Sequence, residues 1–351
     1  MRSELIPAMR ALALCALVVI IASASLAFGQ NPQYPTTQPR DETKPKDAGP
    51  KISDGEAKAI DKINASPTIN EKITAATEFV KKYPKSTMRE KVALHLAGEA
   101  AKVTDTAQQI TAMEGILAVF DQPKESEVLY PALIDAYVKA QRPEDALTAT
   151  NKYLEKNPGD VGVLTQMALV STDQLKRQKS NFIQPAQGFS SKAIELIEAD
   201  KKPDTIEPEK WNEYKTKWLP HLYQSLGIVA YLTQNKADAK VKLEKAVSLK
   251  STDPVTYMLL GGMADEEYQE AAKKYQAMGA GPLKDETLKE AHAKLDVAIE
   301  FYAQAVALAS NQPGYEQLHN QLKQNLESYY KYRHNNSTNG MEELINKYKK
   351  P

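Results

Sequence analysis

The sequence is short of cysteine and tryptophan, and it carries no excess of charge of either sign. Its one cysteine, Cys15, lies inside an apolar N-terminal run, so the rest of the chain can form no disulfide and has no thiol nucleophile. Lys and Arg total 45 residues, as do Asp and Glu, so no global field draws the protein to nucleic acid or to an anionic surface. Ordinary apolar packing must therefore hold the fold together. The abundance of Ala, Lys, Glu, Gln and Leu favours helices for that packing.

The N-terminus has the pattern of an export signal. Arg2 and Arg10 precede the apolar run ALALCALVVIIASASLAF, which ends in small residues and is shorter than a usual membrane span. Cleavage after Ala24 or after Gly29 would satisfy the small-residue rule of signal peptidase. We therefore expect residues 1–29 to be a cleaved signal peptide and the mature protein to be periplasmic or secreted, in a bacterium. The alternative is an uncleaved signal that anchors the chain in the inner membrane, which would be its one link to a membrane.

The composition then changes twice along the chain. Residues 30–50, QNPQYPTTQPRDETKPKDAGP, carry five prolines and almost no apolar side chains, so they are predicted to form a disordered, proline-rich linker. From Ser53, which with Glu56 has the spacing of a capping box, apolar residues recur at helical intervals and no strand-like alternation appears. The predicted fold class is therefore all-α. After two helices that begin near Ser53 and Pro67, the predicted helices cover 87–102, 105–120, 124–141, 143–156, 159–177, 185–199, 208–233, 236–249, 254–278, 284–309, 313–334 and 340–348.

An internal repeat runs through the middle of the chain. In LYQSLGIVAYLTQNKADAKVKLEKAVSLKSTDP, the aromatic Tyr223 is followed by Gly227 and then by a second helix that carries small residues. TYMLLGGMADEEY repeats the start of this pattern, with Tyr257 in the place of Tyr223 and with Gly261 following Gly227 by 34 residues. LYPALIDAYVKAQRPEDALTATNKYLEKNPGD has a related pattern that begins at Tyr130.

These residues resemble the tetratricopeptide repeat, whose period is 34 residues. In that family each unit is a pair of antiparallel helices, and small residues such as Gly227, Ala239 and Ala246 let neighbouring backbones approach. The resemblance implies a right-handed α-α superhelix with a concave groove, in a protein of the exported bacterial envelope type. The implied division is degenerate repeats over 51–126, repeats over 127–312 (about 127–160, 161–219, 220–253 and 254–312) and C-terminal capping helices over 313–351.

The sequence shows no pattern of catalytic or metal-binding residues. The five histidines include no HExxH pair and no two at a spacing of three or four, and His95 with Glu99 is more simply a solvated helix face. No GxSxG elbow occurs, and the glycines of MGAGPLKDE lack the strand and the GK[ST] ending of a phosphate loop. We therefore predict a protein that is not an enzyme and that uses neither a cofactor nor a metal.

Trp211, Tyr214 and Trp218 lie at spacings that place their rings on one face of a helix. Packing against a neighbouring helix is the preferred interpretation, and a platform for a glycan or cell-wall ligand is the alternative. Pro220 follows directly and is expected to kink or interrupt the helix.

The resemblance also implies where a partner would bind, because the concave groove comes mainly from the first helix of each pair. The family's clamp for a C-terminal carboxylate needs Lys and Asn at positions where this chain has Pro131 and Asp135, then Gln224 and Ile228, so chaperone-tail recognition is not expected. The mixed apolar and polar groove suits a segment of another protein better than a nucleic acid, which needs a basic track. The implied groove residues are Asp135, Val138, His221, Gln224, Ile228, Tyr231, Met258 and Asp265.

The C-terminal stretch ESYYKYRHNNSTNG at 327–340 has the mixture of rings and cations expected of a binding site. It continues a helix in which Leu318, Leu322 and Leu326 share one face. Cations suit the last turn of that helix, and Asn335 and Asn336 suit its end. We therefore predict a helix that covers the end of the array, followed by a turn and a short last helix around Met341, Leu344 and Ile345.

Three functions remain open from the sequence. The favoured one is a non-enzymatic scaffold or adaptor of the bacterial envelope that binds other proteins in its groove. The second is a periplasmic binding protein for a glycan or cell-wall ligand that uses the tryptophan stripe. The third is an enzyme with an unrecognised site.

Overall fold

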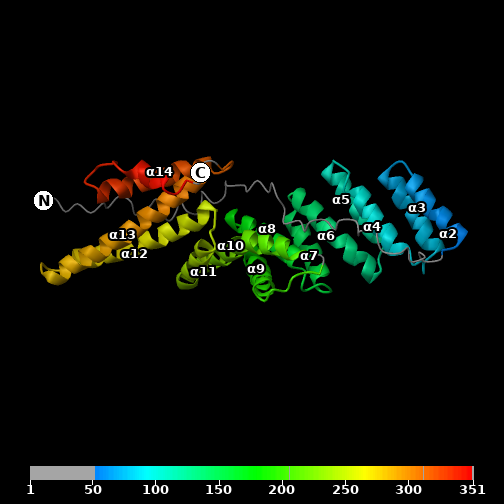
Figure 1. Ribbon diagram of the computed structural model, residues 1–351, viewed down its shortest axis with the longest axis horizontal. Coiled ribbons are helices and arrows are strands. Elements are labelled where there is room, and N and C mark those ends of the chain that lie inside the picture. The colour runs from blue at the N-terminus through cyan, green and yellow to red at the C-terminus, as the bar shows by residue number, and fades with distance from the viewer. Residues whose placement is uncertain (1–51, 205, 311, 350–351) are drawn as a thin grey trace. The chain divides into compact units, whose positions relative to one another are not determined.

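The computed structural model describes residues 52–204, 206–310 and 312–349, and in these residues the protein is all-α with no strand. The predicted fold class is confirmed, because the helices pack as consecutive pairs (Figure 1). The described chain divides into two compact units at residues 170 and 171. The predicted signal peptide and the proline-rich linker lie outside the described residues. No helix in the described part of the chain is both long enough and apolar enough to span a membrane.

The first unit covers residues 52–170. Its helices are α2 (Asp54–Ala65), α3 (Ile69–Lys82), α4 (Arg89–Ala100), α5 (Thr106–Val119), α6 (Pro123–Lys139) and α7 (Pro143–Leu154). Helix α8 (Val161–Lys176) starts in this unit and ends in the next. The pairs α2 with α3, α5 with α6 and α6 with α7 pack side by side over an apolar core. The largest side chains buried in that core include Phe79, Leu96, Ile116, Phe120 and Ile134.

The second unit covers residues 171–349. It contains the short 3-10 turn η2 (Ser180–Phe182) and the helices α9 (Ile183–Glu198), α10 (Pro208–Leu232), α11 (Lys236–Ser248), α12 (Pro254–Ala277), α13 (Pro282–Ala309), α14 (Glu316–Arg333) and α15 (Met341–Asn346). Figure 1 shows α12 and α13 running side by side as a long hairpin.

The small residues of the repeat have the predicted role. A Cβ atom at Gly227 of α10 would lie 2.6 Å from Cγ of Leu243 on α11, so the two backbones could not approach as closely with alanine there. Ala239 and Ala246 of α11 are fully buried. The close packing of the α10–α11 pair therefore depends on these small side chains.

The helix starts follow local capping chemistry, with one departure from the predicted capping box. The Ser53 hydroxyl accepts a hydrogen bond from the Glu56 amide at 3.3 Å, as expected at an N-cap. The Glu56 carboxylate does not return to Ser53 and instead accepts a hydrogen bond from the Ser86 hydroxyl. A carboxylate does cap the backbone at α6, where the backbone N–H of Gln122 donates a hydrogen bond to Oε2 of Glu125 at 3.1 Å. The prediction of a full box at Ser53 was therefore wrong, because a distant serine competes for the carboxylate.

Of the two effects predicted for Pro220, a kink or an interruption, the interruption of α10 does not occur. The helix runs from Pro208 to Leu232 with Pro220 buried inside it. A proline removes the hydrogen bond to the carbonyl four residues earlier. That residue, Thr216, is exposed, so water can replace the missing donor.

The C-terminal helices α14 and α15 pack against α13 of the last hairpin. Leu318, Leu322, Leu326, Tyr329 and Tyr330 of α14 are all buried, on the side that packs against α13. The Tyr329 ring stacks on the Tyr302 ring of α13 with centroids 5.7 Å apart. The stretch that resembled a binding site is thus largely a packing surface.

The end of α14 also follows the prediction. Asn335 and Asn336 adopt positive φ angles of 51° and 64°, which asparagine tolerates better than most residues. Gly340 has a φ of 91°, and a Cβ atom there would meet the Tyr330 hydroxyl oxygen at 2.7 Å. The following helix α15 buries Met341 and Ile345.

Candidate functional site

The first unit has a surface hollow of about 330 Å3 between α5, α6 and α7, which we call the α5–α7 hollow. Each helix contributes residues at helical spacing, so three amphipathic faces converge on one depression. Apolar and aromatic side chains form its walls, and charged groups lie among them. The lining residues are Glu114, Leu117, Ala118, Tyr130, Leu133, Tyr137, Asp145, Thr148, Ala149 and Lys152.

Tyr137 is the best-defined polar group of this hollow. Its hydroxyl donates a hydrogen bond to Oε1 of Glu114 at 2.6 Å and so joins α6 to α5. Burial of the ring, together with the Glu114 carboxylate, raises the pKa of Tyr137 to about 12. The phenol therefore remains a neutral donor at physiological pH.

A cation of the protein already lies on the Tyr137 ring. The guanidinium carbon of Arg142 is 4.9 Å from the ring centroid, within the range of a cation–π interaction. The Arg142 Nε donates to Oδ2 of Asp145 at 2.7 Å. Arg142 and Asp145 are each nearly half exposed, with 45% and 46% of their side-chain surface accessible. This guanidinium is consequently held at the edge of the hollow and not inside the core.

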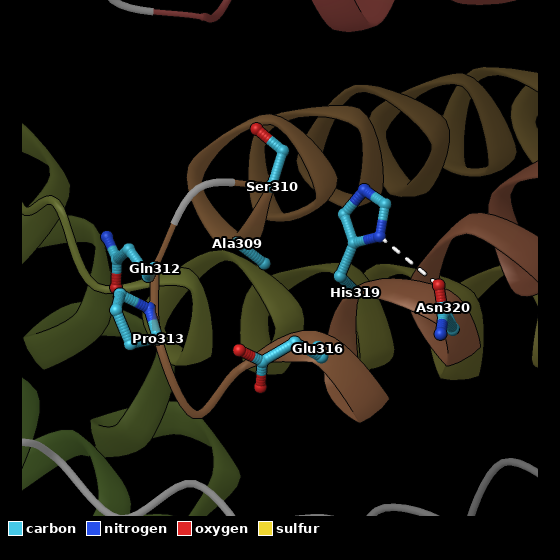
Figure 2. Close-up of a pocket in the computed structure, with 7 residues that line it drawn as sticks. All are labelled: Ala309, Ser310, Gln312, Pro313, Glu316, His319 and Asn320. Carbon is cyan, nitrogen blue, oxygen red and sulfur yellow. Dashed lines mark hydrogen bonds between the residues drawn. The ribbon is translucent and has the colours of Figure 1, made fainter.

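The second unit has its own hollow of about 360 Å3, which we call the α13–α14 hollow. It lies where the end of α13 turns into α14, and Figure 2 shows its lining residues: Ala309, Ser310, Gln312, Pro313, Glu316, His319 and Asn320. Its polar groups already have internal partners. The Gly314 amide donates to Glu316 at 3.2 Å, and the His319 Nδ1 lies 3.4 Å from Oδ1 of Asn320. With few apolar walls, this hollow offers a partner less surface to bury than the α5–α7 hollow does.

Within the described residues, no group of three or more His, Cys, Asp or Glu side chains could hold a metal ion. Glu99, the residue one turn from His95, binds two lysines instead, with Lys72 at 3.1 Å and Lys102 at 2.5 Å. The predicted interpretation of His95 and Glu99 as a helix face agrees with these contacts.

The structure corrects part of the predicted groove. Gln224, Ile228, Met258 and Asp265 are buried, with at most 5% of their surface exposed, so they offer no accessible surface to a partner. Gln224 and Ile228 lie on the buried face of α10, and Met258 and Asp265 lie on α12, where every residue from Pro254 to Gly261 is buried. These positions of α10 and α12 therefore do not form an open groove.

The other four predicted residues keep some accessible surface but do not form one site. Asp135 and Val138 lie on α6 of the first unit, and neither lines the α5–α7 hollow. Asp135 forms an ion pair with Lys139 at 2.5 Å. His221 and Tyr231 are half-buried on α10 of the second unit. Their role in binding remains a prediction.

The tryptophan stripe is a packing surface. Trp211, Tyr214 and Trp218 are buried, with 2%, 8% and 7% of their surface exposed. The rings of Trp211 and Tyr214 stack with centroids 5.5 Å apart, and the Trp211 indole nitrogen donates to Asp200 at 2.8 Å. The preferred interpretation of the stripe is confirmed, and the alternative of an exposed glycan platform is wrong because the rings are covered.

The sequence prediction missed the α5–α7 hollow for a clear reason. Tyr130 was identified only as the start of a repeat pattern, and Tyr137 follows it by two helical turns on the same face of α6. On α7 the spacing of Asp145, Thr148 and Lys152 also marks one face. The contribution of α5, above all Glu114, depends on how the helices pack, which no local pattern gives.

Comparison with known proteins adds little to this description. No protein-family model matches the chain, and no curated protein matches it. Among solved structures, it is similar to a tetratricopeptide repeat protein from Parabacteroides merdae ATCC 43184, at 12% identity and a TM-score of 0.35, over 83% of this chain and 95% of that chain. A TM-score at this level carries no argument, so the fold class rests on the helix pairs themselves.

Proposed function

We propose that this chain is a non-enzymatic scaffold of tetratricopeptide-like helix pairs that binds a segment of another protein in the α5–α7 hollow. The observation that supports the proposal is the hollow itself, where Leu117, Ala118 and Tyr130 offer accessible apolar area beside charged groups. Such a combination suits a peptide segment, which brings side chains to bury and backbone groups to bind. The proposed repeat boundaries are those of the sequence, with repeats over 127–312.

We further propose that the protein acts in the bacterial envelope. The support for this is the sequence of residues 1–29, which has the basic start, apolar run and small residues of an export signal. A scaffold without disulfides fits this compartment if its core is large and apolar, as the cores of the two units are.

Photo-crosslinking in the native host tests the proposed function. A photoreactive amino acid is placed at Thr148, which is exposed and lines the hollow. The matched control is the same amino acid at Ala107, which is exposed on α5 and does not line the hollow. We expect crosslinks from Thr148 to map to one defined segment of a partner, and crosslinks from Ala107 not to reach that segment.

A second variant blocks the hollow. Ala118 is exposed at its wall, so Ala118→Trp fills the depression without altering the core. The Thr148 crosslink should disappear in this variant while the helix content, followed by circular dichroism, is unchanged. Equal crosslinking with and without Ala118→Trp would refute partner binding in the hollow.

A further inference from the structure

The α5–α7 hollow has a charge pattern that narrows the class of its partner. Glu114 and Asp145 lie among its apolar walls, and Lys152 is the one cation that lines it. Glu127, one turn before Tyr130 on α6, is an exposed carboxylate outside the lining, and its charge helps to raise the pKa of Tyr153 after the larger effects of burial and of Asp160. Two carboxylates and one cation thus line the hollow, and Glu127 and Arg142 add one charge of each sign close to it.

The tyrosine and the two carboxylates are arranged to hold a cation, and Arg142 already occupies this arrangement. Its guanidinium lies 4.9 Å from the Tyr137 ring centroid and binds Asp145 at 2.7 Å. A planar guanidinium between a ring face and a carboxylate is the geometry that arginine favours. Because the Arg142 side chain is nearly half exposed, it can rotate away from the ring. An arginine from another protein could then take the same place.

From this geometry we infer that the partner segment presents an arginine to the Tyr137 ring between Glu114 and Asp145, with an aliphatic neighbour packed against Leu117 and Tyr130. The inference rests on the proposed function, since it names the partner class of the same hollow. The partner displaces Arg142, which acts as an internal competitor for the site. The hollow therefore selects a basic, aliphatic segment and discriminates against an acidic one.

The second unit contains a matched group that serves as a control. The Tyr223 hydroxyl donates to Glu198 at 2.6 Å, and the Lys245 ammonium lies 5.8 Å from the Tyr223 ring centroid. This group has the same phenol, carboxylate and cation, but none of the three lines the α5–α7 hollow. Changes at Glu198 should therefore leave partner selection unaltered.

A positional-scanning hexapeptide library, presented to the full chain, tests the inference. We expect arginine to be enriched at one position with an aliphatic residue beside it. The double variant Glu114→Gln, Asp145→Asn should weaken the binding of enriched peptides by roughly tenfold or more. Glu198→Gln, and Glu144→Gln at an exposed neighbour of Asp145, should not change it.

The variant Arg142→Ala should change peptide affinity in the opposite direction to the double variant. Removing the internal competitor should tighten the binding of the arginine peptides by about fivefold, the scale of an exposed cation–π interaction. Lys139→Ala, which removes a nearby exposed cation, should have no such effect. If Arg142 itself recruited an acidic partner, Arg142→Ala would weaken binding instead.

The outcomes separate the inference from the proposed function. If retained peptides show no preference for arginine, or prefer Asp and Glu, and Ala118→Trp still abolishes their retention, the inference is overturned and segment binding in the hollow stands. If retention is equal for the wild type and for Ala118→Trp, both fail. Arginine enrichment that survives the double variant also overturns the inference, since the cation would then lie elsewhere.

Discussion

Among the described residues, each of the two units buries an ion pair between distant helices, and the two pairs differ in chemistry. In the first unit Arg89 of α4 donates two hydrogen bonds to Glu125 of α6, from Nε to Oε1 at 2.5 Å and from Nη2 to Oε2 at 2.9 Å. In the second unit Lys176 at the end of α8 makes one contact to Asp253, at 3.2 Å. The side chains of both pairs are at most 6% exposed. The arginine fork contacts both oxygens of Glu125, which also accepts the Gln122 backbone amide at 3.1 Å, whereas the single ammonium contact leaves more lone pairs of Asp253 to be satisfied by others.

Asp253 obtains those other partners from two further sources. Its Oδ1 accepts from the Val255 amide at 2.9 Å, as the N-cap of α12, and from the Tyr315 hydroxyl at 3.4 Å. Burial would raise the pKa of Asp253, but the Lys176 ammonium and the Val255 amide outweigh burial and hold that pKa below its usual value. The lysine pair therefore organises the ends of α8, α12 and α14 together, while the arginine pair joins two helices.

Removing Asp253 has the largest expected effect. Asp253→Ala leaves the buried Lys176 charge without its partner and removes the cap of α12, so the second unit should lose about 3–5 kcal/mol of stability. Both tryptophans of the chain, Trp211 and Trp218, lie in this unit, so tryptophan fluorescence in a urea titration reports on it alone. Asp238→Ala breaks an exposed ion pair with Lys242 and should leave the transition in place. If the Asp253→Ala variant unfolded at the same urea concentration as the wild type, the Lys176–Asp253 pair would not stabilise the second unit as described.

Weakening the Arg89–Glu125 pair should lower the stability of the first unit, by less than the loss of Asp253 lowers that of the second. Arg89→Lys keeps the charge but loses one of the two bonds to Glu125, which should cost about 1.5–3 kcal/mol. The first unit contains no tryptophan. In a urea titration, far-UV circular dichroism should therefore show that this unit unfolds at a lower urea concentration than in the wild type, while the tryptophan fluorescence transition stays unchanged. Arg142→Lys alters an exposed pair and is the control. A shift of the fluorescence transition would mean that the two ion pairs do not stabilise their units separately.

The smallest expected effect on stability concerns the two tyrosine–glutamate pairs, Tyr137 with Glu114 and Tyr223 with Glu198. Burial, assisted by the partner glutamate, raises the pKa of both Tyr137 and Tyr223 from 10.0 to about 12. Since these folded-state values lie above the unfolded value, the stability that each neutral phenol contributes is present below pH 10 and is lost between about pH 10 and pH 12. In an alkaline titration followed by the near-ultraviolet absorbance of tyrosinate, Tyr137→Phe and Tyr223→Phe should each remove one component with a midpoint near 12. If the variant instead lost a component with a midpoint near pH 10, the replaced tyrosine would not be buried and hydrogen-bonded to its glutamate as described.

Local sequence patterns predicted the helices well, because helix limits depend on neighbouring residues. The helix expected over 208–233 is α10, Pro208–Leu232, and the helices expected over 313–334 and 340–348 are α14 and α15. Asn335 and Asn336 end α14 through their own conformational preference.

Contacts between distant helices were the part that the sequence could not supply. Nothing in the pattern pairs Lys176 with Asp253, which lie 77 residues apart. Nothing pairs Glu114 with Tyr137 either, so the α5–α7 hollow went unseen. The groove residues Met258 and Asp265 were placed by family resemblance, and they proved to be buried because α12 is covered on more sides than that resemblance implied.

The affinity of the crosslinked partner segment for wild type and for Ala118→Trp is the most direct test of the central claim. The segment that crosslinks to Thr148 is synthesised as a peptide and titrated against both full chains by calorimetry, with Ala107→Trp as the matched control. The account predicts that Ala118→Trp weakens binding by at least about tenfold and that Ala107→Trp leaves it unchanged. Equal affinity for wild type and Ala118→Trp, with both proteins folded, would contradict the assignment of partner binding to the α5–α7 hollow.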